Sequence, residues 1–222
     1  MKKLIISGQI SILSMPSVAG LNVLYIGDSH SVGPFGWKLD SLLRTHPESK
    51  VATYASCGSI ANWWWNNTVT PCGYYFKGQD ALVISGTKGP TPNFPTLMAD
   101  IKPNYVIVEL GANYGGLPSD NFAITDMAKV VKVIKDSGAK CFWITKPDSR
   151  KNANDIPRIL DLTYKAVHDY CQIFDSTQVT KYPATGGDGI HYWFPAAIPI
   201  ADAWAQAAFD DFSEMVKAND QI

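Results

Sequence analysis

The segment Val23-Leu24-Tyr25-Ile26-Gly27-Asp28-Ser29-His30-Ser31 joins an apolar run to a turn of small and polar residues. The apolar run predicts a strand over residues 23–26. After the turn, Leu39, Leu42 and Leu43 share one face of a helix that we predict over residues 33–44. Strand-like and helix-like stretches continue to alternate along the chain, and this alternation is typical of a parallel sheet with helices on both faces.

Further strands and helices follow from the same periodicities. Apolar runs predict four more strands, at residues 51–55, 105–110, 141–145 and 171–174. Helical spacing of apolar residues predicts three more helices, near residues 121–137, 156–170 and 195–217. Residues 57–95 form a long loop rich in Gly, Pro, Asn and aromatic residues, and loops of this length are usually functional. We therefore expect one α/β domain with a five-stranded, mainly parallel sheet.

The size and charge of the chain limit its classes of function. At 222 residues it falls within the range of one domain, which we assign to residues 20–222. Its 20 acidic and 19 basic residues nearly cancel. A chain with so little net charge has no field to draw it onto nucleic acid or an anionic membrane, so we expect neither as a partner. The sequence does not decide the oligomeric state, for which we favour a monomer.

The first 19 residues have the features of a signal peptide. Lys2 and Lys3 precede a mostly apolar stretch over residues 4–15 that is too short to span a bilayer, and Ser17-Val18-Ala19 resembles a cleavage site. We predict cleavage after Ala19 and hence an exported protein, periplasmic or secreted. The alternative is that these residues form the first strand or helix of the fold. No later segment is long and apolar enough to cross a membrane.

Four cysteines fit an oxidising compartment, in which disulfides persist, and they allow three connectivities. Cys141 and Cys171 each begin a predicted strand, and the first residues of neighbouring parallel strands can lie within disulfide reach. Cys57 and Cys72 would then close the loop between them. No pair has the close spacing of a zinc site. We therefore expect disulfides, with no metal and no other cofactor; free buried thiols remain the alternative.

Ligands of an open parallel sheet bind beyond the carboxyl ends of its strands. Ser29 follows the first predicted strand at the start of a helix, whose partial positive charge favours an anion nearby. Serine is a weak nucleophile without a base, and His191 with Asp188 can supply a base and a group that orients it. Acyl transfer also needs donors for an oxyanion. The backbone N–H groups of Ser29 and Gly58 and the side-chain amide of Asn113 are candidates.

Four segments together resemble the four conserved blocks of the SGNH (GDSL-type) hydrolases: Gly27-Asp28-Ser29, Gly58, Gly111-Ala112-Asn113 and Asp188-Gly189-Ile190-His191. They occur in the family's order, from about residue 21 to the last predicted helix. The resemblance implies a flavodoxin-like three-layer α/β/α sandwich and an esterase or acetylesterase that uses Ser29, His191 and Asp188. It also implies an oxyanion hole formed by Ser29, Gly58 and Asn113. One position departs from the pattern: Tyr114 follows Asn113 where the family usually has Asp, so what that acid supports is open.

Other residues near these blocks have competing interpretations. Gly-Asp-Ser alone is explained equally well by a turn and a helix cap, so the catalytic assignment depends on the later Asn113 and His191. Ser31 is the competing nucleophile, although we expect it to cap the following helix. His30 should point elsewhere, because it is adjacent to the nucleophile. The lipase-type motif G-x-S-x-G is absent around Ser31, which disfavours the larger α/β-hydrolase fold.

Runs of aromatic residues follow the second block and the candidate base. We name as candidate substrate contacts Trp63, Trp64, Trp65, Tyr114, Tyr192 and Trp193. Flat amphipathic rings around a serine would suit stacking on sugars, so we hypothesise an acetyl ester on an extracytoplasmic carbohydrate such as cell-wall glycan. The alternative is that some of these rings fill the core. Three other functions stay open: a lipid or thioester hydrolase, an O-acyltransferase and a non-catalytic glycan-binding module.

Overall fold

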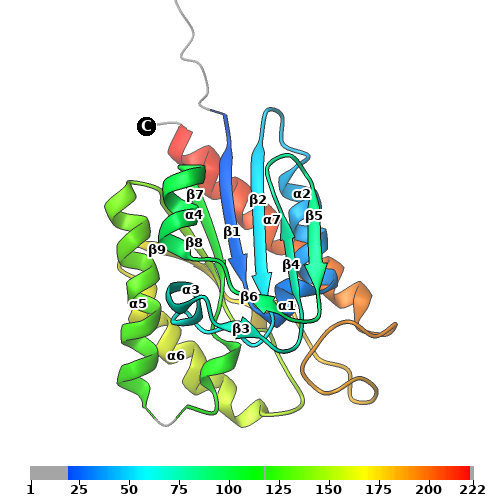
Figure 1. Cartoon of the computed structure of the whole chain (residues 1–222). Helices are drawn as coiled ribbons and strands as arrows, with labels where there is room; N and C mark the ends of the chain where they lie inside the picture. Colours follow the sequence, from blue (N-terminus) through cyan, green and yellow to red (C-terminus); the bar gives the residue numbers. More distant parts are fainter. Residues whose placement is uncertain (1–19, 118, 221–222) are drawn as a thin grey trace, which may run out of the picture.

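The computed structural model describes residues 20–117 and 119–220, so the predicted signal peptide (residues 1–19) lies outside the described residues. Its centre is a seven-stranded sheet in the order β5-β4-β2-β1-β7-β8-β9 (Figure 1). The strands are β1 (Asn22–Gly27), β2 (Lys50–Ser56), β4 (Tyr74–Lys77), β5 (Val83–Gly86), β7 (Tyr105–Glu109), β8 (Lys140–Ile144) and β9 (Cys171–Phe174). The strands β2, β1, β7, β8 and β9 run parallel to one another. At one edge of the sheet, β4 pairs antiparallel with β2, and β5 pairs antiparallel with β4.

The prediction of a mainly parallel α/β sheet is confirmed, but the predicted number of five strands is wrong. The five predicted strands are the parallel ones, and the other two come from the long loop after β2. Every residue of β5 is exposed, and every residue of β4 is only partly buried. Neither strand therefore carries the buried apolar run by which the other five can be recognised in the sequence.

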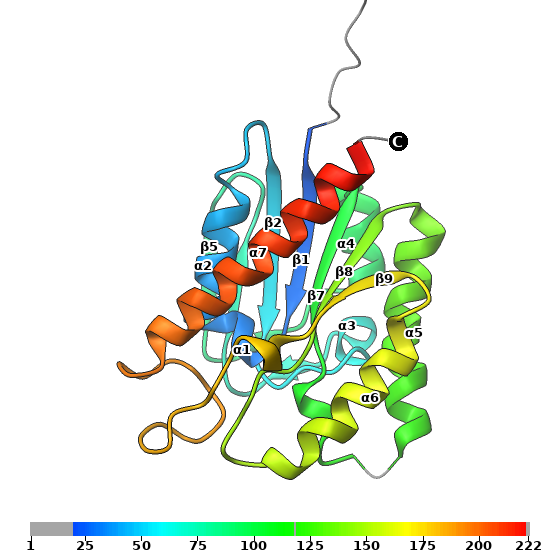
Figure 2. The same ribbon diagram turned by 180° about the vertical axis from the view of Figure 1, so that it is seen from behind.

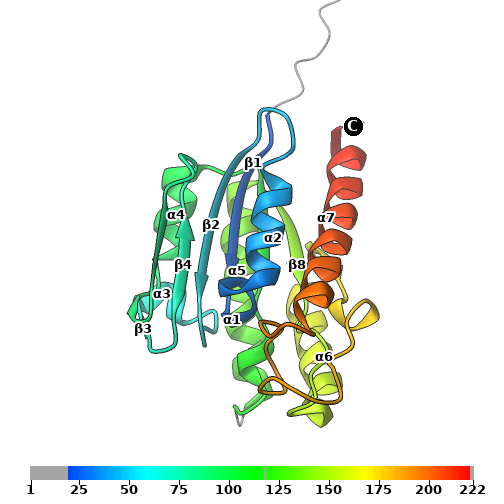
Figure 3. The ribbon, with the colours of Figure 1, turned by 90° about the vertical axis from the view of Figure 1, so that its right-hand side faces the viewer.

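Helices cover both faces of the sheet, as predicted. Helices α2 (Pro34–Leu43) and α7 (Ile198–Asp220) lie on one face (Figure 2). The other face carries α4 (Phe94–Ile101), α5 (Asp120–Ser137) and α6 (Ile156–Val167), and the sheet lies between the two helical layers (Figure 3). Helix α4 is not among the predicted helices, because eight residues are too few to show a repeated apolar stripe. Within the described residues, no helix combines the length and apolar character needed to cross a membrane.

Several short elements connect these layers. They are α1 (Ser29–Val32), α3 (Trp63–Asn66), the two-stranded ribbon β3 (Val69–Thr70) with β6 (Gly89–Pro90), and the 3₁₀ helices η1 (Ala112–Tyr114), η2 (Ala153–Asp155) and η3 (Ser176–Gln178). Gly33 separates α1 from α2. The helix after the first strand is therefore preceded by a separate single turn, and Ser29 begins that turn.

Two apolar layers hold the helices onto the sheet. Leu24 and Ile26 of β1 belong to the core under α4, α5 and α6, whereas Val23 and Tyr25 belong to the core under α2 and α7. Successive side chains of a strand point to opposite faces of the sheet. A central strand that is covered on both faces must therefore be apolar throughout, which explains the continuous apolar run of β1.

Two disulfide bonds join the four cysteines. Cys141 and Cys171 are register partners at the start of β8 and β9, with their Cα atoms 4.5 Å apart. Cys57 and Cys72, with Cα atoms 5.5 Å apart, close the loop that leads from β2 to β4. Cys57 directly precedes Gly58, so the Cys57–Cys72 bond restrains the segment that carries a candidate oxyanion donor.

The carboxyl ends of β1, β2 and β7 meet at one edge of the sheet, at the bottom of Figure 1. The chain leaves this edge as α1, as the turn containing Gly58 and as η1. Since these strands are parallel neighbours, segments that are far apart in the sequence are brought to a common place. This is the edge at which ligands of open α/β sheets bind.

Candidate active site

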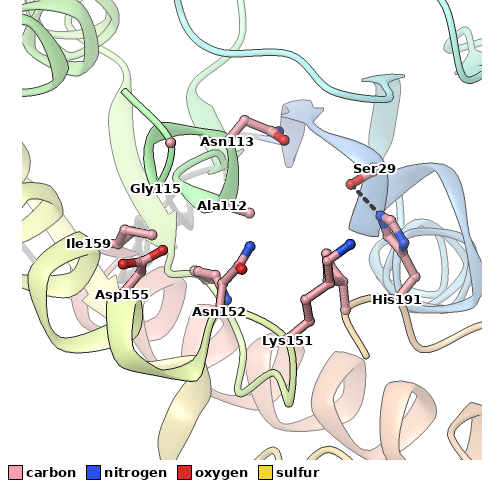
Figure 4. A pocket seen from close by; sticks show the side chains of 12 residues that line it. Ser29, Ala112, Asn113, Gly115, Lys151, Asn152, Asp155, Ile159 and His191 are labelled. Atoms are coloured by element: carbon pink, nitrogen blue, oxygen red, sulfur yellow. Dashed lines mark hydrogen bonds between the residues drawn. The ribbon is translucent and has the colours of Figure 1, made fainter. Parts of the chain in front are cut away.

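Ser29, His191 and Asp188 form a continuous hydrogen-bonded chain at this edge. Ser29 is the first residue of α1, and its Oγ lies 2.9 Å from Nε2 of His191 (Figure 4). On the other side of the ring, Nδ1 of His191 lies 2.5 Å from Oδ2 of Asp188. The fold thus brings the three predicted residues together. In this order the imidazole can accept a proton from the serine while the carboxylate faces the opposite nitrogen.

The carboxylate of Asp188 is held in its ionised form. Its Oδ1 accepts hydrogen bonds from the backbone N–H groups of Ile190 and His191, each at 2.8 Å. Burial alone would raise the pKa of Asp188, but the hydrogen bonds from the His191 ring and from these two amides outweigh it and lower the pKa to about 2. A carboxylate of this kind is negative at neutral pH and fixes the tautomer of the imidazole that faces it.

The three candidate oxyanion donors differ in how far they are already engaged. Within the described residues, the backbone N–H groups of Ser29 and Gly58 donate no hydrogen bond to another part of the chain. Gly58 has a φ of +80°, a left-handed conformation that favours glycine. The amide of Asn113 donates to Oδ2 of Asp28 (3.1 Å) and to the backbone oxygen of Ser59 (3.0 Å). Asn113 must therefore exchange one of these acceptors before it can donate to an oxyanion.

No protein-family model matches the chain, and no curated protein matches it. Solved structures do match. A peptidoglycan O-acetylesterase aligns over 91% of this chain and 93% of its own, with a TM-score of 0.61 and 13% identity. Esterase EstA from Pseudoalteromonas sp. aligns over 87% and 99%, with a TM-score of 0.56 and 14% identity. A GDSL-like lipase from Bacteroides thetaiotaomicron aligns over 85% and 87%, with a TM-score of 0.53 and 12% identity.

The chain has the SGNH hydrolase fold. The resemblance drawn from the four sequence segments is thereby confirmed at the level of the fold. Similarity at 12–14% identity shows no more than the fold, so the reaction of this SGNH-fold protein has to be argued from its own site.

A buried polar cluster lies beneath α1. Ser31 is fully buried, and its Oγ donates to Oε2 of Glu109 (2.8 Å) and lies 2.6 Å from the hydroxyl of Tyr25. The N-cap of α2 is Gly33, so the prediction that Ser31 caps this helix is wrong. Its burial also removes Ser31 as a competing nucleophile in this conformation. Gly27 makes the arrangement possible, because a Cβ at Gly27 would lie 1.9 Å from Oγ of Ser31.

Asp28 and His30 belong to the same buried region. Asp28 accepts a hydrogen bond from the backbone N–H of His30 (3.1 Å), and burial raises the pKa of Asp28 to about 6. Burial also raises the pKa of the neighbouring Glu109 well above its ordinary range. The ring of His30 is buried, with its centroid 5.4 Å from that of His191 and 5.8 Å from that of Trp204. Burial lowers the pKa of His30, so its imidazole is neutral and adds no second positive charge beside His191.

Tyr114, the departure from the family pattern, supports the loop that follows Gly58. Its hydroxyl donates to Oδ2 of Asp126 (2.8 Å) and accepts from the backbone N–H of Ala61 (2.9 Å). The same oxygen of Asp126 accepts from the backbone N–H of Asn62 (2.9 Å). Both Tyr114 and Asp126 are buried, and Asp126 lies on α5. No local sequence motif could reveal Asp126, since it meets this loop only in the folded chain.

Most of the candidate aromatic contacts are not on the surface. Five of the six are buried or pack against the core: Trp63, Trp64, Trp65, Tyr114 and Tyr192. The prediction of an aromatic wall around the serine is wrong, because consecutive residues of a one-turn helix such as α3 cannot all face the same side. The polar ends of the three buried rings are bonded inside the protein: the indole N–H of Trp64 donates to Oγ of Ser59 (3.3 Å), the hydroxyl of Tyr114 to Asp126 (2.8 Å) and the hydroxyl of Tyr192 to the backbone oxygen of Asp148 (2.6 Å). Trp193, at 45% exposed, is the exception.

A cavity of about 240 Å³ opens beside Ser29 and His191 (Figure 4). Its wall includes four polar side chains that are not among the sequence-predicted site residues: Lys146, Lys151, Asn152 and Asp155. Lys146 lies two residues after β8, and this position at the carboxyl end of a parallel strand is the signal that could have found it. In the ranges 20–117 and 119–220, no three His, Cys, Asp or Glu side chains are grouped so as to hold a metal ion.

Proposed function

We propose that this protein is a serine hydrolase of carboxylic esters, with Ser29 as nucleophile, His191 as base and Asp188 as the residue that orients the base. The observation that carries the proposal is the unbroken chain from Ser29 Oγ through the His191 ring to the Asp188 carboxylate, with distances of 2.9 and 2.5 Å. The serine and the histidine are 162 residues apart in the sequence. A turn and a helix cap would account for the serine but give no reason for this histidine to face it.

In the proposed reaction, His191 first accepts a proton and then donates it. Nε2 of His191 takes the proton of Ser29 as Oγ bonds to the ester carbonyl carbon, and Asp188 stabilises the imidazolium that forms. When the bond from that carbon to the alcohol oxygen breaks, His191 gives the proton to the leaving alcohol, and the acyl group stays on Ser29. Water then attacks the acyl carbon while His191 takes its proton. The bond between the acyl carbon and Oγ of Ser29 then breaks, His191 returns the proton to Oγ, and the carboxylic acid leaves.

The negative charge that develops on the carbonyl oxygen needs preorganised donors. The backbone N–H groups of Ser29 and Gly58 have no other acceptor among the described residues, so they can donate to the oxyanion directly. We assign the third donor to the Asn113 amide, which exchanges its bond to Ser59 or Asp28 for one to the oxyanion.

Within this class we propose that the substrate is an O-acetyl group on an extracytoplasmic carbohydrate. The cavity supports a short acyl group on a polar alcohol, because Ile159 and Ile190 are the only large apolar side chains that the described residues contribute to its wall. Two disulfides support an exported protein. One of the structures with the same fold is named as a peptidoglycan O-acetylesterase, and cell-wall glycan is therefore the first carbohydrate to test.

Three alternatives make different demands on the same site. A lipid or thioester hydrolase needs a groove for an acyl chain. An O-acyltransferase uses the same serine and histidine but passes the acyl group to a sugar hydroxyl instead of water. A non-catalytic glycan-binding module keeps the fold without turnover, and the complete Ser29, His191 and Asp188 arrangement argues against it.

The deciding experiment measures acetate release from a panel of O-acetylated polysaccharides, with the Ser29→Ala variant as the blank. We expect acetate release by the wild-type protein and none above background by Ser29→Ala. Ser31→Ala is the matched serine control, since its hydroxyl is buried away from the cavity. Turnover that survives in Ser29→Ala would disprove the assigned nucleophile.

A series of aryl esters of increasing chain length separates acetyl esters from lipids. We expect the highest kcat/KM with acetate and a steep fall for longer acyl chains. Ready cleavage of long acyl esters without any release of acetate from glycans would replace the carbohydrate esterase by a lipid hydrolase. Transfer of acetate to an added sugar at the expense of free acetate would identify an acyltransferase.

A further inference from the structure

The cavity beside Ser29 contains a buried ammonium group with no carboxylate against it. Lys146 is 4% exposed, and its Nζ donates to Oγ of Ser149 at 2.7 Å and to the backbone oxygen of Pro147 at 3.5 Å. No carboxylate oxygen of the described residues forms an ion pair with this nitrogen within 4.0 Å. An ammonium group that leaves water without a counterion is costly to bury, so such groups are usually paired.

More distant acidic groups surround Lys146 without touching it. Burial lowers the pKa of Lys146, and the carboxylates of Asp28, Asp148, Asp155 and Glu109 oppose that shift. An ammonium group has three N–H donors, of which Ser149 and Pro147 take two, the second at the limit of a hydrogen bond. Lys146 therefore keeps the capacity to bind a further acceptor from the cavity that it lines.

A second ammonium group points into the same cavity. Figure 4 shows Nζ of Lys151 extending toward Ser29 and His191, and this nitrogen has no hydrogen bond or ion pair with any described residue. The backbone of Lys151 is held in place, since its N–H donates to the oxygen of Gly189 (2.9 Å) and its oxygen accepts from Oγ of Ser149 (2.9 Å). The hydroxyl of Ser149 thus links the positions of Lys146 and Lys151.

Lys151 and Asp155 lie in different parts of the cavity wall (Figure 4). Lys151 lies on the side of His191, whereas Asp155 lies at the far side next to Ile159 and Gly115 (Figure 4). A ligand whose negative group lies close to the scissile ester would meet Lys151 and keep that group away from Asp155, and Lys146 lines the same cavity. A ligand with no negative group would leave the buried ammonium of Lys146 without a counterion.

We propose that the substrate is an O-acetylated sugar acid, which carries a carboxylate on the same sugar ring as the ester. This proposal rests on the proposed esterase function. Lys146 and Lys151 are the specificity-determining residues: their ammonium groups form charge-assisted hydrogen bonds to the carboxylate while the acetyl carbonyl carbon faces Ser29. The sugar carboxylate supplies the counterion that the folded chain does not provide for Lys146.

The test compares two acetylated sugars that differ only at one group. One is an O-acetylated methyl glucuronoside, and the other is the corresponding methyl glucoside, in which CH₂OH replaces the carboxylate. For the wild-type protein we expect kcat/KM to be roughly 10- to 100-fold higher for the acidic sugar, the range for hydrogen bonds to charged groups. This preference should shrink as the salt concentration rises, because exposed charge at Lys151 is screened.

Lys146→Met and Lys151→Gln should each reduce the ratio of the two kcat/KM values, mainly through a higher KM for the acidic sugar. Lys151 is exposed, so its variant folds even if Lys146→Met does not. Lys140→Gln is the matched control: it removes the same charge from the opposite end of β8 and should keep the ratio. If the lysine variants lose kcat/KM equally for both sugars, the proposal is overturned. Such a result would show that the lysines act on the oxyanion or on stability.

A binding measurement separates this proposal from the esterase function. Calorimetry with the Ser29→Ala variant compares methyl glucuronoside with methyl glucoside, neither of which needs to be hydrolysed. Tighter binding of the glucuronoside that is lost in Ser29→Ala/Lys151→Gln supports the carboxylate site even if no ester is cleaved. Cleavage of neutral acetyl esters that depends on Ser29, together with equal binding of the two glycosides, would retain the esterase and reject the carboxylate site.

Discussion

The indole ring of Trp193 stacks on the imidazole of His191, with ring centroids 4.1 Å apart and ring planes inclined by 22°. Trp193 is 45% exposed, so it covers one face of the imidazole from the solvent side. In the proposed reaction His191 becomes a cation each time it accepts a proton from serine or water. A cation over the face of an indole is attracted by about 0.5–2 kcal/mol, depending on its exposure.

Trp193→Ala should therefore lower kcat by roughly 2- to 30-fold, and Trp193→Phe by less, because phenylalanine is a weaker partner for a cation. The measurement is kcat and KM with a small aryl acetate that has no sugar. If the loss appears only in KM for a glycan, Trp193 is a substrate contact and the stacking on His191 has no part in the reaction.

Asn113→Ala should lower kcat by about 100- to 1000-fold, the usual scale for one oxyanion donor. The variant also removes a donor from Asp28 and Ser59, so its folding is checked by circular dichroism. A loss smaller than about tenfold, again measured with an aryl acetate, would mean that the backbone N–H groups of Ser29 and Gly58 hold the oxyanion without the amide.

Tyr114→Phe should lower the free energy of unfolding by about 1–3 kcal/mol, because it removes one donor from the buried carboxylate of Asp126 and leaves the backbone N–H of Ala61 without its acceptor. Urea denaturation measures the change. Asp126→Asn is the partner variant, and the double variant should lose less than the sum of the two single losses, since both belong to one hydrogen-bond network. Additive losses would contradict the coupling between these two side chains.

The two disulfides should differ in their effect on activity. Their sequence separations are 15 and 30 residues, so each contributes on the order of 3–4 kcal/mol to stability in the chain-entropy account. Replacing Cys57 and Cys72 by Ser should also lower kcat at temperatures well below unfolding, because this bond restrains the loop next to Gly58. Replacing Cys141 and Cys171 by Ser, at the opposite end of the sheet, is the control. Equal kcat in the two double variants would show that the Cys57–Cys72 bond has no role in the site.

Glu109→Gln should raise the melting temperature more at pH 8 than at pH 5. Burial raises the pKa of Glu109 well above its ordinary range, so folding favours the protonated form of this group relative to the unfolded chain. The stability that it contributes is therefore lost as the pH rises from its unfolded pKa toward its folded pKa. Glutamine does not titrate and still accepts the hydrogen bond from Ser31. Thermal unfolding at both pH values checks the sign, and an equal shift at pH 5 and pH 8 would show that folding does not raise the pKa of Glu109.

Sequence patterns are most informative where burial is complete. The apolar run of β1 is continuous because the strand is covered on both faces, and the same holds for the other parallel strands. The hairpin of β4 and β5 is different. Its residues are exposed or half-buried, and they form strands because β4 pairs with β2 across a loop. That pairing is a non-local hydrogen-bond pattern with no apolar period to mark it.

The residues of the site likewise divide into those that the sequence reveals and those that only the fold reveals. Ser29, Gly58 and Asn113 could be found because each follows a strand of the parallel sheet, where such residues meet. The runs of aromatic residues led to a wrong prediction, because consecutive aromatic residues in a sequence do not indicate which side chain is buried. Trp64 is fully buried, although nothing distinguishes it in the sequence from its two neighbours.

The sequence by itself determined the alternation of strands and helices, the order of the strand-end segments and the types of residue available for acyl transfer, because these depend on local periodicity and on side-chain chemistry. Only the tertiary structure decided that His191 faces Ser29, that Asp126 supports the loop after Gly58, and that Lys146 lies buried in the cavity without a carboxylate against it. Distances between remote segments and the direction of each side chain follow from how the layers pack, and packing is a property of the whole chain.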